Sequence, residues 1–395
     1  MKLRICRSAT VPFFLHHHLR SQIQATLAAG HDVTLISSDG PEMSALRQST
    51  AASFCMIDMA RTISPWRDFR SLWRLYRHFR HARYDIVHST TPKAGLLCAV
   101  AGWLANVPIR LHTFTGQPWV ELHGMTRVLA KAADWLTARL NTMNFADSSS
   151  QRDFLVNMGV CRSGKVSVIG SGSLAGVDVR RFDRGLVQRS FQNMREHLAI
   201  ADDAIVIVFV GRLVRDKGVV ELVHAHQALR KQYADLKLVL VGPKEPDRDP
   251  LPAEVIQMIE QDDSIFSVGY TDQPEAYLVG ADIFCLPSYR EGFGNVVIEA
   301  AAVGVPAVGT DIVGLRDAIV HEKTGLLVPA KNVEALKNGL ARMLEDSTLR
   351  QYFGEQAHAR ATSLYDCNSV NQLLLEEYEM LAKKCLKNKG NTDRY

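Results

Sequence analysis

Short apolar runs alternate with longer segments of helical periodicity along the whole chain, and this alternation constrains the fold more than any other feature. Alternating β and α elements predict parallel sheets joined by right-handed crossovers. Strands are predicted at Leu3–Cys6, Asp32–Ser37, Ser53–Ile57, Ile86–Ser89, Ile109–Thr113, Met143–Ala146, Val166–Ile169, Ile205–Val210, Lys237–Val241, Ile265–Val268, Ile283–Pro287, Ala307–Thr310 and Gly325–Val328. Helical patterns such as Leu19–Ala29 and Val219–Gln232 lie between them.

The strand series restarts near Ile205, after a charge-rich span from Asp178 to Asp203 that we interpret as a linker. A chain of 395 residues favours two domains. We therefore expect an α/β fold with Rossmann-like doubly wound domains at 1–185 and 186–365, and an interdomain cleft lined by strand carboxyl ends. A final helix is expected at 366–385, followed by a disordered tail at 386–395.

Charge and cysteine usage bear on the compartment. Residues 1–180 contain 21 Lys and Arg against 11 Asp and Glu, whereas the rest contain 25 against 31, so the first half favours an anionic partner or surface. The seven cysteines are scattered, odd in number and form no CxxC, which favours a reducing compartment. The start is too charged for a signal peptide, and the longest apolar stretch, Ala94–Ala105, is too short to span a bilayer. We expect a cytoplasmic protein whose membrane contact is peripheral.

Two carboxylates bracket a Gly-Phe-Gly turn in the stretch from Glu291 to Glu299, between a predicted strand and a predicted helix. The backbone N–H groups of Phe293, Gly294 and Asn295 would then lie at a helix N-terminus, which favours an anion. Glu291 and Glu299 would reach different parts of one ligand, as a sugar attached to a nucleoside diphosphate requires. An E-x7-E spacing also occurs by chance on solvated helices, so a second motif has to support this interpretation.

That second motif is GRLVRDKG at 211–218, which closes the first strand of the second series. Arg212 presents a planar fork to phosphate oxygens, and Lys217 presents a mobile point charge. Together they would stabilise a departing diphosphate. An ordinary basic surface loop is the alternative.

With these motifs the chain resembles the retaining glycosyltransferases of family 4, which have the GT-B fold. The resemblance rests on 211–218, on VGYTDQPEAYLVGADIFCLPSYREGFGN at 268–295, on EGFGNVVIE at 291–299 and on the segment 319–329. It implies a nucleotide-sugar donor, retention at the anomeric carbon and no metal cofactor. It also implies an N-terminal acceptor-binding domain and a C-terminal donor-binding domain.

Carried onto this sequence, the resemblance assigns roles to individual residues. Arg212 and Lys217 would grip the diphosphate, and Glu299 the ribose. Glu291 and the backbone of Phe293–Asn295, with Val296 next along the helix, would hold the donor sugar. Tyr270 and Thr271 would lie near the base.

The first half departs from the family pattern in two places. The family commonly has a Gly-Gly loop after the first strand, where this chain has Ala9–His18 with the triplet His16, His17 and His18. Consecutive helical residues do not converge on one ion, so a metal site there is not expected.

The second departure is a histidine that many relatives carry before Gly116, where this chain has Thr115. Either His112 takes over a polar contact with the donor sugar or Thr115 supplies a weaker one; His112 as a packed histidine at a strand end is the alternative. Lys93, in a loop that resembles the family's acceptor side, would meet an acceptor phosphate, and Thr113 lies in the same acceptor-side group.

Two further motifs each allow two interpretations. In the helix WRDFRSLWRLYRHFRHAR at 66–83, one face carries Arg67, Arg70, Arg74, Arg77 and His81, and another carries Phe69, Leu72, Trp73, Tyr76 and Phe79. This helix would either rest on anionic lipid or pack its aromatic side chains on the sheet. Asp247–Asp249 resembles a DxD metal motif, but it lies in a proline-rich turn that explains it equally well.

The sequence thus predicts a retaining hexosyltransferase that moves a sugar, N-acetylhexosamine by preference, from a UDP-sugar to a polyprenyl-diphosphate-linked saccharide. The setting would be bacterial surface polysaccharide, O-antigen, capsule or glycoprotein glycan synthesis, with no nucleic-acid partner. A UDP-sugar 2-epimerase of the same fold is the alternative enzyme, and a non-catalytic nucleotide-sugar-binding module is a third reading.

Overall fold

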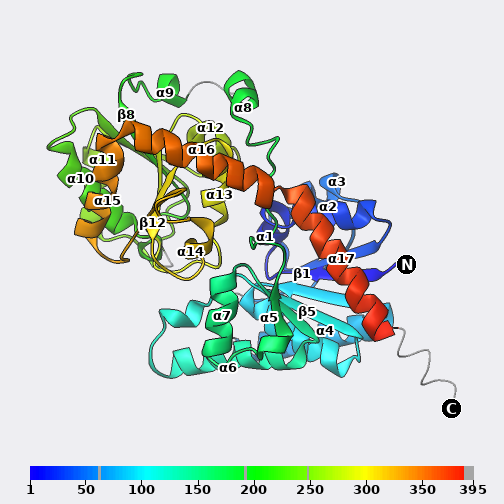
Figure 1. Cartoon of the computed structure of the whole chain (residues 1–395). Coiled ribbons are helices and arrows are strands. Elements are labelled where there is room, and N and C mark those ends of the chain that lie inside the picture. Colours follow the sequence, from blue (N-terminus) through cyan, green and yellow to red (C-terminus); the bar gives the residue numbers. More distant parts are fainter. Residues whose placement is uncertain (61–63, 191–193, 247–248, 387–395) are drawn as a thin grey trace, which may run out of the picture. The chain divides into compact units, whose positions relative to one another are not determined.

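The structure, a computed structural model, describes residues 1–60, 64–190, 194–246 and 249–386. The chain forms two compact units (Figure 1). One contains residues 1–176 and the chain from Cys367 onward, and the other contains residues 177–366. The first boundary therefore lies at Gly176–Val177, earlier than the expected 185–186. Of the predicted disordered tail at 386–395, Leu386 still belongs to the final helix, and 387–395 lie outside the described residues.

The first unit is built on a sheet whose seven described strands are all parallel, in the order β3-β2-β1-β4-β5-β6-β7. Strands buried on both faces are apolar throughout, which is why short apolar runs predict them well. The strands are β1 (Arg4–Ser8), β2 (Asp32–Ser37), β3 (Ser53–Met56), β4 (Ile86–Thr90), β5 (Ile109–Phe114), β6 (Met143–Ala146) and β7 (Val166–Val168).

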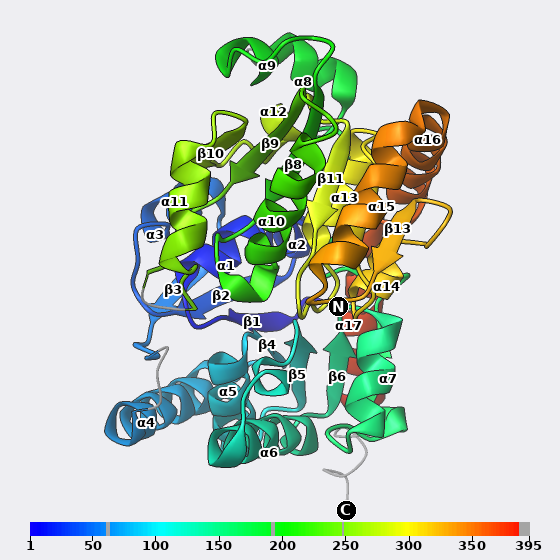
Figure 2. The same cartoon turned by 90° about the vertical axis from the view of Figure 1, so that its left-hand side faces the viewer.

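Helices cover both faces of this sheet. They are α1 (Pro12–His17), α2 (Arg20–Ala28), α3 (Met43–Ser49), α4 (Pro65–Ala82), α5 (Pro92–Leu104), η1 (Pro118–Val120), α6 (Gly124–Leu140), α7 (Ser149–Asn157), η2 (Ser163–Lys165) and α17 (Cys367–Leu386). Cys6 and Val87 point into the core beneath α4 and α5, whereas Ile5 and Ile86 point into the core beneath α17. The alternation of side chains along a strand therefore puts α17 on the opposite face from α4 and α5. In Figure 2, α4, α5 and α6 form a row along one face.

A buried arginine ties α17 to the first unit. The Arg7 guanidinium donates to the Tyr378 hydroxyl of α17 and to Gln22 Oε1, each at 2.8 Å, and contacts His88 Nδ1. These three partners of Arg7, all among the described residues, carry no charge. The pKa of His88 is held well below its ordinary value by burial and by Arg7, so the imidazole adds no second charge.

The second unit repeats the plan with six described parallel strands in the order β10-β9-β8-β11-β12-β13. These strands are β8 (Ile205–Val210), β9 (Leu236–Val241), β10 (Ile265–Gly269), β11 (Ile283–Leu286), β12 (Ala307–Thr310) and β13 (Gly325–Val328). The helices are α8 (Arg184–Ser190), α9 (Met194–His197), η3 (Arg215–Lys217), α10 (Val219–Arg230), α11 (Ala253–Gln261), α12 (Pro274–Leu278), α13 (Asn295–Ala302), α14 (Leu315–Ala318), α15 (Val333–Glu345) and α16 (Ser347–Leu364). The predicted doubly wound parallel architecture is confirmed in both units.

The predicted linker at 178–203 is wrong. Phe182, Met194 and Ile200 are buried in the core of the second unit, so this span belongs to that unit. Its apolar residues are spaced too widely among charged ones to form a periodic pattern, and the sequence pattern therefore predicted a linker. A backbone hydrogen bond of 2.7 Å from Val177 N to Tyr365 O places the start and the end of the unit side by side.

One close approach in the first unit can be tested directly. A Cβ atom added at Gly95 of α5 would lie 2.4 Å from Cε1 of the buried His112 ring on β5. Because neither partner has room to move, we expect Gly95→Ala to cost about 1–3 kcal/mol. The melting temperature of this unit should fall by about 2–4 °C for each kcal/mol, as measured by calorimetry. Gly164→Ala is the matched control, because a Cβ there meets nothing within 4 Å; equal melting temperatures for the two variants would contradict the close approach.

Candidate functional site

The second unit has a topological switch point between β8 and β11. These strands are neighbours in the sheet, but the chain continues from β8 to β9 on one side and from β11 to β12 on the other. In open parallel sheets, ligands bind outside the carboxyl ends of the strands at such a point. The loops that follow β8 and β11 carry the two motifs recognised in the sequence, 211–218 and 291–299.

The two loops pack against each other without room for a side chain. Gly218 has φ 70°, a left-handed conformation that glycine adopts at no steric cost. A Cβ atom there would lie 2.0 Å from the carbonyl oxygen of Pro287. The backbone N–H of Tyr289 donates to Asp216 O at 2.8 Å. The motif glycine therefore allows the strand ends to hold their side chains in one place.

Lys217 and Glu291 meet across these loops. Lys217 Nζ forms an ion pair with Glu291 Oε1, and Ser288 Oγ donates to the same carboxylate oxygen at 2.8 Å. Both charged side chains are largely but not fully buried. Ser288 is itself fixed because its carbonyl accepts a hydrogen bond from the Thr310 hydroxyl. Two residues that the resemblance assigns to the diphosphate and to the donor sugar of one ligand are thus in direct contact.

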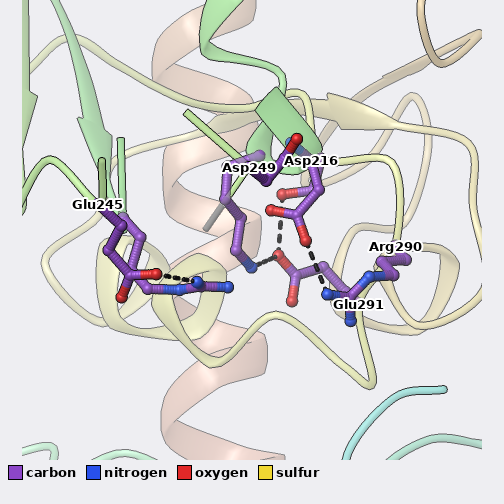
Figure 3. A network of polar contacts seen from close by, with 8 residues as sticks. Asp216, Glu245, Asp249, Arg290 and Glu291 are labelled. Carbon is purple, nitrogen blue, oxygen red and sulfur yellow. Dashed lines mark hydrogen bonds and ion pairs between the residues drawn. The ribbon is translucent and has the colours of Figure 1, made fainter. Parts of the chain in front are cut away.

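Further ion pairs flank this contact (Figure 3). Arg212 Nη1 lies 2.7 Å from Glu245 Oε2, and Arg290 Nη2 lies 2.7 Å from Asp216 Oδ2. Sequence reasoning missed Glu245 and Arg290. Arg290 was visible as the residue before the Glu291 motif, whereas Glu245 follows a different strand and nothing in the sequence links it to Arg212.

A helix begins beside the ion pair. Gly294, with φ 90°, is the N-cap of α13, and a Cβ atom there would lie 2.6 Å from Leu315 Cδ2. The positive end of the α13 dipole and the N–H groups of its first turn therefore lie at the carboxyl edge of β11. The Phe293 ring is buried, 5.2 Å from the ring of Tyr365, so only the backbone of Phe293 can serve a ligand. Val296 is half-buried in the first turn.

Glu299 lies one turn further along α13, among charged groups that the sequence did not reveal. Burial raises the pKa of its carboxyl to about 7; Arg181 lowers the pKa and Glu275 raises it. Arg181 is itself held by Glu275 through hydrogen bonds of 2.9 and 2.8 Å. Because Glu275 already compensates Arg181, the arginine only partly offsets the burial of Glu299.

The predicted base-side residues lie further along the same edge. Tyr270 and Thr271 follow β10, which is separated from β8 by β9. Tyr270 is exposed, and Thr271 Oγ1 accepts a hydrogen bond from Gln273 N at 3.0 Å. The structure therefore places them at the carboxyl end of the sheet, apart from the Lys217–Glu291 pair.

The predicted acceptor-side residues of the first unit do not form one exposed group. His112 and Thr113 are buried, and they bond to Ser89 Oγ at 3.0 Å and to His88 Nε2 at 2.8 Å. Burial lowers the pKa of His112 to about 3. These contacts correct the expectation that His112 or Thr113 faces a ligand, and they leave Thr115, half-buried after β5, as the accessible one of the three.

Lys93 opens α5 after β4 and forms an ion pair of 2.6 Å with Asp68 of α4. It lies at the switch point of the first sheet, where β1 and β4 are neighbours. The pairing was not foreseen, because Asp68 is 25 residues away in a different helix.

Neither motif that suggested a metal gains support from the described residues. His16 and His17 end α1 and His18 follows it, and their rings are not part of a cluster of possible ligands. Of the DxD segment, Asp247 lies outside the described residues. Asp249 Oδ2 accepts a hydrogen bond from Asp216 N at 2.7 Å, a contact that shapes the loop after β8.

Comparisons with known proteins decide the family. Residues 15–172 match the model of the glycosyl transferase 4-like domain, and residues 190–360 match that of glycosyl transferases group 1. This chain is a family 4 glycosyltransferase.

Individual relatives match this glycosyltransferase over most of its length. The chain is 27% identical to the capsular polysaccharide biosynthesis glycosyltransferase CapM of Staphylococcus aureus, over 93% of this chain and 94% of CapM. It is 24% identical to the UDP-Gal:alpha-D-GlcNAc-diphosphoundecaprenol alpha-1,3-galactosyltransferase of Escherichia coli, over 80% and 81% of the two chains. The crystal structure of Anabaena Alr3699/HepE in complex with UDP-glucose shares the fold, with a TM-score of 0.79, 19% identity and coverage of 96% and 100%.

The raised pKa of Glu299 makes a stability prediction for the glycosyltransferase. Between the ordinary pKa of 4.5 and the folded value of about 7, the folded state binds more protons at this carboxyl than the unfolded state. Stability therefore falls as the pH rises through this window and stays lower above it. Glu299→Gln should match the wild-type melting temperature near pH 4, below the ordinary pKa, and exceed it at pH 8, without ligand. A difference that does not change with pH would contradict this assignment.

Proposed function

We propose that this glycosyltransferase transfers a sugar, N-acetylhexosamine by preference, from a UDP-sugar to a saccharide linked to polyprenyl diphosphate, with retention at the anomeric carbon. The product would enter a surface polysaccharide, O-antigen, capsule or glycoprotein glycan. The observation that carries the proposal is the Lys217–Glu291 contact at a sheet switch point, beside the N-terminus of α13.

The charges at this point suit a diphosphate leaving group. Arg212 and Lys217 are both partly accessible, and each holds a carboxylate, Glu245 or Glu291. The Arg212–Glu245 pair is the more exposed of the two, and exposed ion pairs contribute only about 0–1 kcal/mol, so a diphosphate can replace Glu245 at small cost. The α13 dipole adds to the positive potential. These groups stabilise the charge that develops on the diphosphate as it departs.

The transfer itself breaks the bond between the anomeric carbon and the β-phosphate oxygen of the donor. The acceptor hydroxyl oxygen forms the new bond to the anomeric carbon on the face that the diphosphate leaves. The acceptor's proton passes to an oxygen of the departing UDP, which therefore acts as the base. Glu291 positions the donor sugar, and Arg212 and Lys217 neutralise the UDP product.

The donor's two ends meet different residues in this proposal. The backbone of Phe293, Gly294 and Asn295 and the Val296 position contact the sugar. Glu299 accepts hydrogen bonds from the ribose hydroxyls, and it does so most strongly in its ionised form. Tyr270 and Thr271 lie at the base end. The UDP donor of the Escherichia coli relative and the UDP-glucose bound by the Anabaena protein favour uridine.

The acceptor assignment draws on the relatives' names and on the first unit. The Escherichia coli relative acts on a diphosphoundecaprenol-linked sugar, and CapM serves capsule biosynthesis. Lys93 and Thr115 are the accessible acceptor-side residues. Within the described residues, no helix is long and apolar enough to cross a bilayer. We place the enzyme at the inner face of the cytoplasmic membrane as a peripheral protein.

Transfer is proposed to proceed without a metal cofactor, because Arg212 and Lys217 supply the positive charge on the diphosphate. Chelation by EDTA should then leave the transfer rate unchanged in a coupled assay for UDP release. A loss of activity that Mg²⁺ or Mn²⁺ restores would contradict this part of the proposal.

Substitution of the cations tests the diphosphate assignment. Lys217→Ala and Arg212→Ala should each lower kcat about 10²–10³-fold, measured with radiolabelled UDP-N-acetylhexosamine and a lipid-diphosphate-linked acceptor. Arg342→Ala and Lys337→Ala are matched controls, because these residues pair with carboxylates at the surface of the same unit. If Arg212→Ala and Lys217→Ala combined in one protein left the rate unaltered, the assignment would fail.

A donor screen distinguishes the transferase hypothesis from the epimerase hypothesis. UDP-GlcNAc, UDP-GalNAc, UDP-glucose and GDP-mannose are incubated with and without the acceptor, and products are resolved by chromatography and NMR. We expect turnover of a UDP-sugar only with the acceptor, and an α-linked product from an α-linked donor. Conversion of the donor to its 2-epimer without acceptor would favour the epimerase.

A further inference from the structure

The tryptophans of this chain are distributed unevenly. Trp66, Trp73, Trp103 and Trp135 are 84%, 50%, 53% and 50% exposed, and all of them belong to the helices α4, α5 and α6. The fifth, Trp119, is 1% exposed. Large aromatic side chains are normally covered in a soluble domain, so this concentration on one helical layer needs a physical reason.

In α4, aromatic side chains are exposed because the helix packs on the sheet with a different face from the one the sequence predicted. Ser71, Leu75 and Phe79 are buried, whereas Phe69 and Trp73 are exposed. Of the predicted packing face, only Phe79 is fully covered. The exposed aromatic side chains share their side of the helix with arginines, and the Arg77 guanidinium lies 4.6 Å from the centre of the Trp73 ring.

The other two helices of the layer are also apolar on the outside. After Lys93, α5 has no charged residue, and its end exposes Trp103 and Leu104. The first turns of α6 are exposed on all sides and carry Met125, Val128 and Leu129. α5 packs beside both α4 and α6, so the three solvent-facing sides form one surface, which we call the α4–α6 face (Figure 2).

The charged groups of the α4–α6 face have one sign. Its exposed charged side chains are the basic residues Arg67, Arg70, Arg74, Arg77, Arg80, Arg127 and Arg139. The two acidic residues of these helices are engaged elsewhere: Asp68 binds Lys93, and the buried Asp134 accepts a hydrogen bond of 2.7 Å from Trp119 Nε1.

We infer that the α4–α6 face docks this enzyme onto an anionic phospholipid bilayer and that α6 and α5 take part in the contact together with α4. Tryptophan and arginine have an apolar body and a polar or charged end, which suits the boundary between acyl chains and headgroups. Exposed cations add attraction to an anionic leaflet, about fivefold in affinity for each residue near the surface. The inference rests on the proposed function only in one respect: the lipid-linked acceptor explains why the enzyme would dock onto a bilayer.

A second copy of the chain is a poorer partner for this face. A two-fold dimer brings the same patch of both subunits together, so arginines would face arginines with no acidic side chain between them. An anionic bilayer meets the same cations with phosphate groups. Charge complementarity therefore selects the lipid surface.

The position of the face connects it to the acceptor side of the first unit. In a parallel sheet, each helix begins at the end where the preceding strand ends. The exposed first turns of α4 and α6 thus lie at the same end of the sheet as Lys93 and Thr115. The Asp68–Lys93 ion pair links the first turn of α4 to the first turn of α5. A bilayer that holds α4 also fixes the distance of Lys93 from the headgroups.

Vesicle binding tests the inference without donor or acceptor. The full chain is mixed with vesicles of phosphatidylcholine alone or of phosphatidylcholine with about 30 mol% phosphatidylglycerol. Bound protein is measured by co-sedimentation. We expect binding to the anionic vesicles, weakened by salt. Vesicles with brominated acyl chains should quench most of the tryptophan emission, because the exposed tryptophans all lie on the α4–α6 face.

Variants on each helix separate this surface from general charge attraction. Trp66→Ser with Trp73→Ser on α4, and Val128→Ser with Leu129→Ser on α6, should each lower the partition coefficient at least tenfold. Arg70→Glu with Arg77→Glu should do the same. The matched controls lie on α17, across the sheet: Leu373→Ser with Met380→Ser, and Lys383→Glu with Lys384→Glu. Circular dichroism checks that each variant folds.

Three results would overturn the inference. These are equal sedimentation with and without anionic lipid, equal losses in the α17 and α4 variants, or a dimer in analytical ultracentrifugation that the α4–α6 substitutions dissociate. Transfer to a short-chain, water-soluble acceptor is measured in parallel. Vesicle binding without transfer would sustain the docking surface and refute the proposed function, whereas transfer without binding would do the reverse.

Discussion

The close packing of the loops that follow β8 and β11 is the constraint on which the donor-side site depends. Gly218 lies against the carbonyl of Pro287 at a distance that no side chain tolerates, and this contact brings Lys217 next to Glu291. Gly218, in its left-handed conformation, is both the C-cap of η3 and the N-cap of α10. The backbone therefore sets where the charged side chains Lys217 and Glu291 lie.

Much of the fold could be predicted because parallel strands are buried on both faces. Each predicted strand has a counterpart in the structure, with ends that differ by a residue or two, as for β4 and β9. What failed was the assignment of surfaces. Helical periodicity groups Phe69, Trp73 and Phe79 on one side of α4, but it does not say which side meets the sheet. The span 178–203 was misread for a related reason, since Phe182 and Met194 are isolated apolar residues in a polar context.

The site divides in the same way. Lys217 and Glu291 could be brought together from the sequence, because the carboxyl ends of neighbouring strands converge on one edge. Their partners could not. Glu245, Arg181 and Glu275 come from segments far away in sequence, and the pairing of Asp68 with Lys93 depends on how two helices pack. His112 looked like a ligand-facing histidine, yet its ring fills the space that Gly95 leaves open. Motifs identify a loop, and packing decides which of its side chains reach solvent.

The chain order of the first unit has a consequence for how the protein is made. Its sheet is complete by residue 168, but α17, with Tyr378 and Leu374 in its core, is translated after the whole second unit. Until then, the Arg7 guanidinium lacks one of its buried hydrogen-bond acceptors. On the ribosome, the later-encoded unit can finish folding before the earlier one does. A stop codon that removes only the last helix would therefore damage the half of the molecule that is synthesised first.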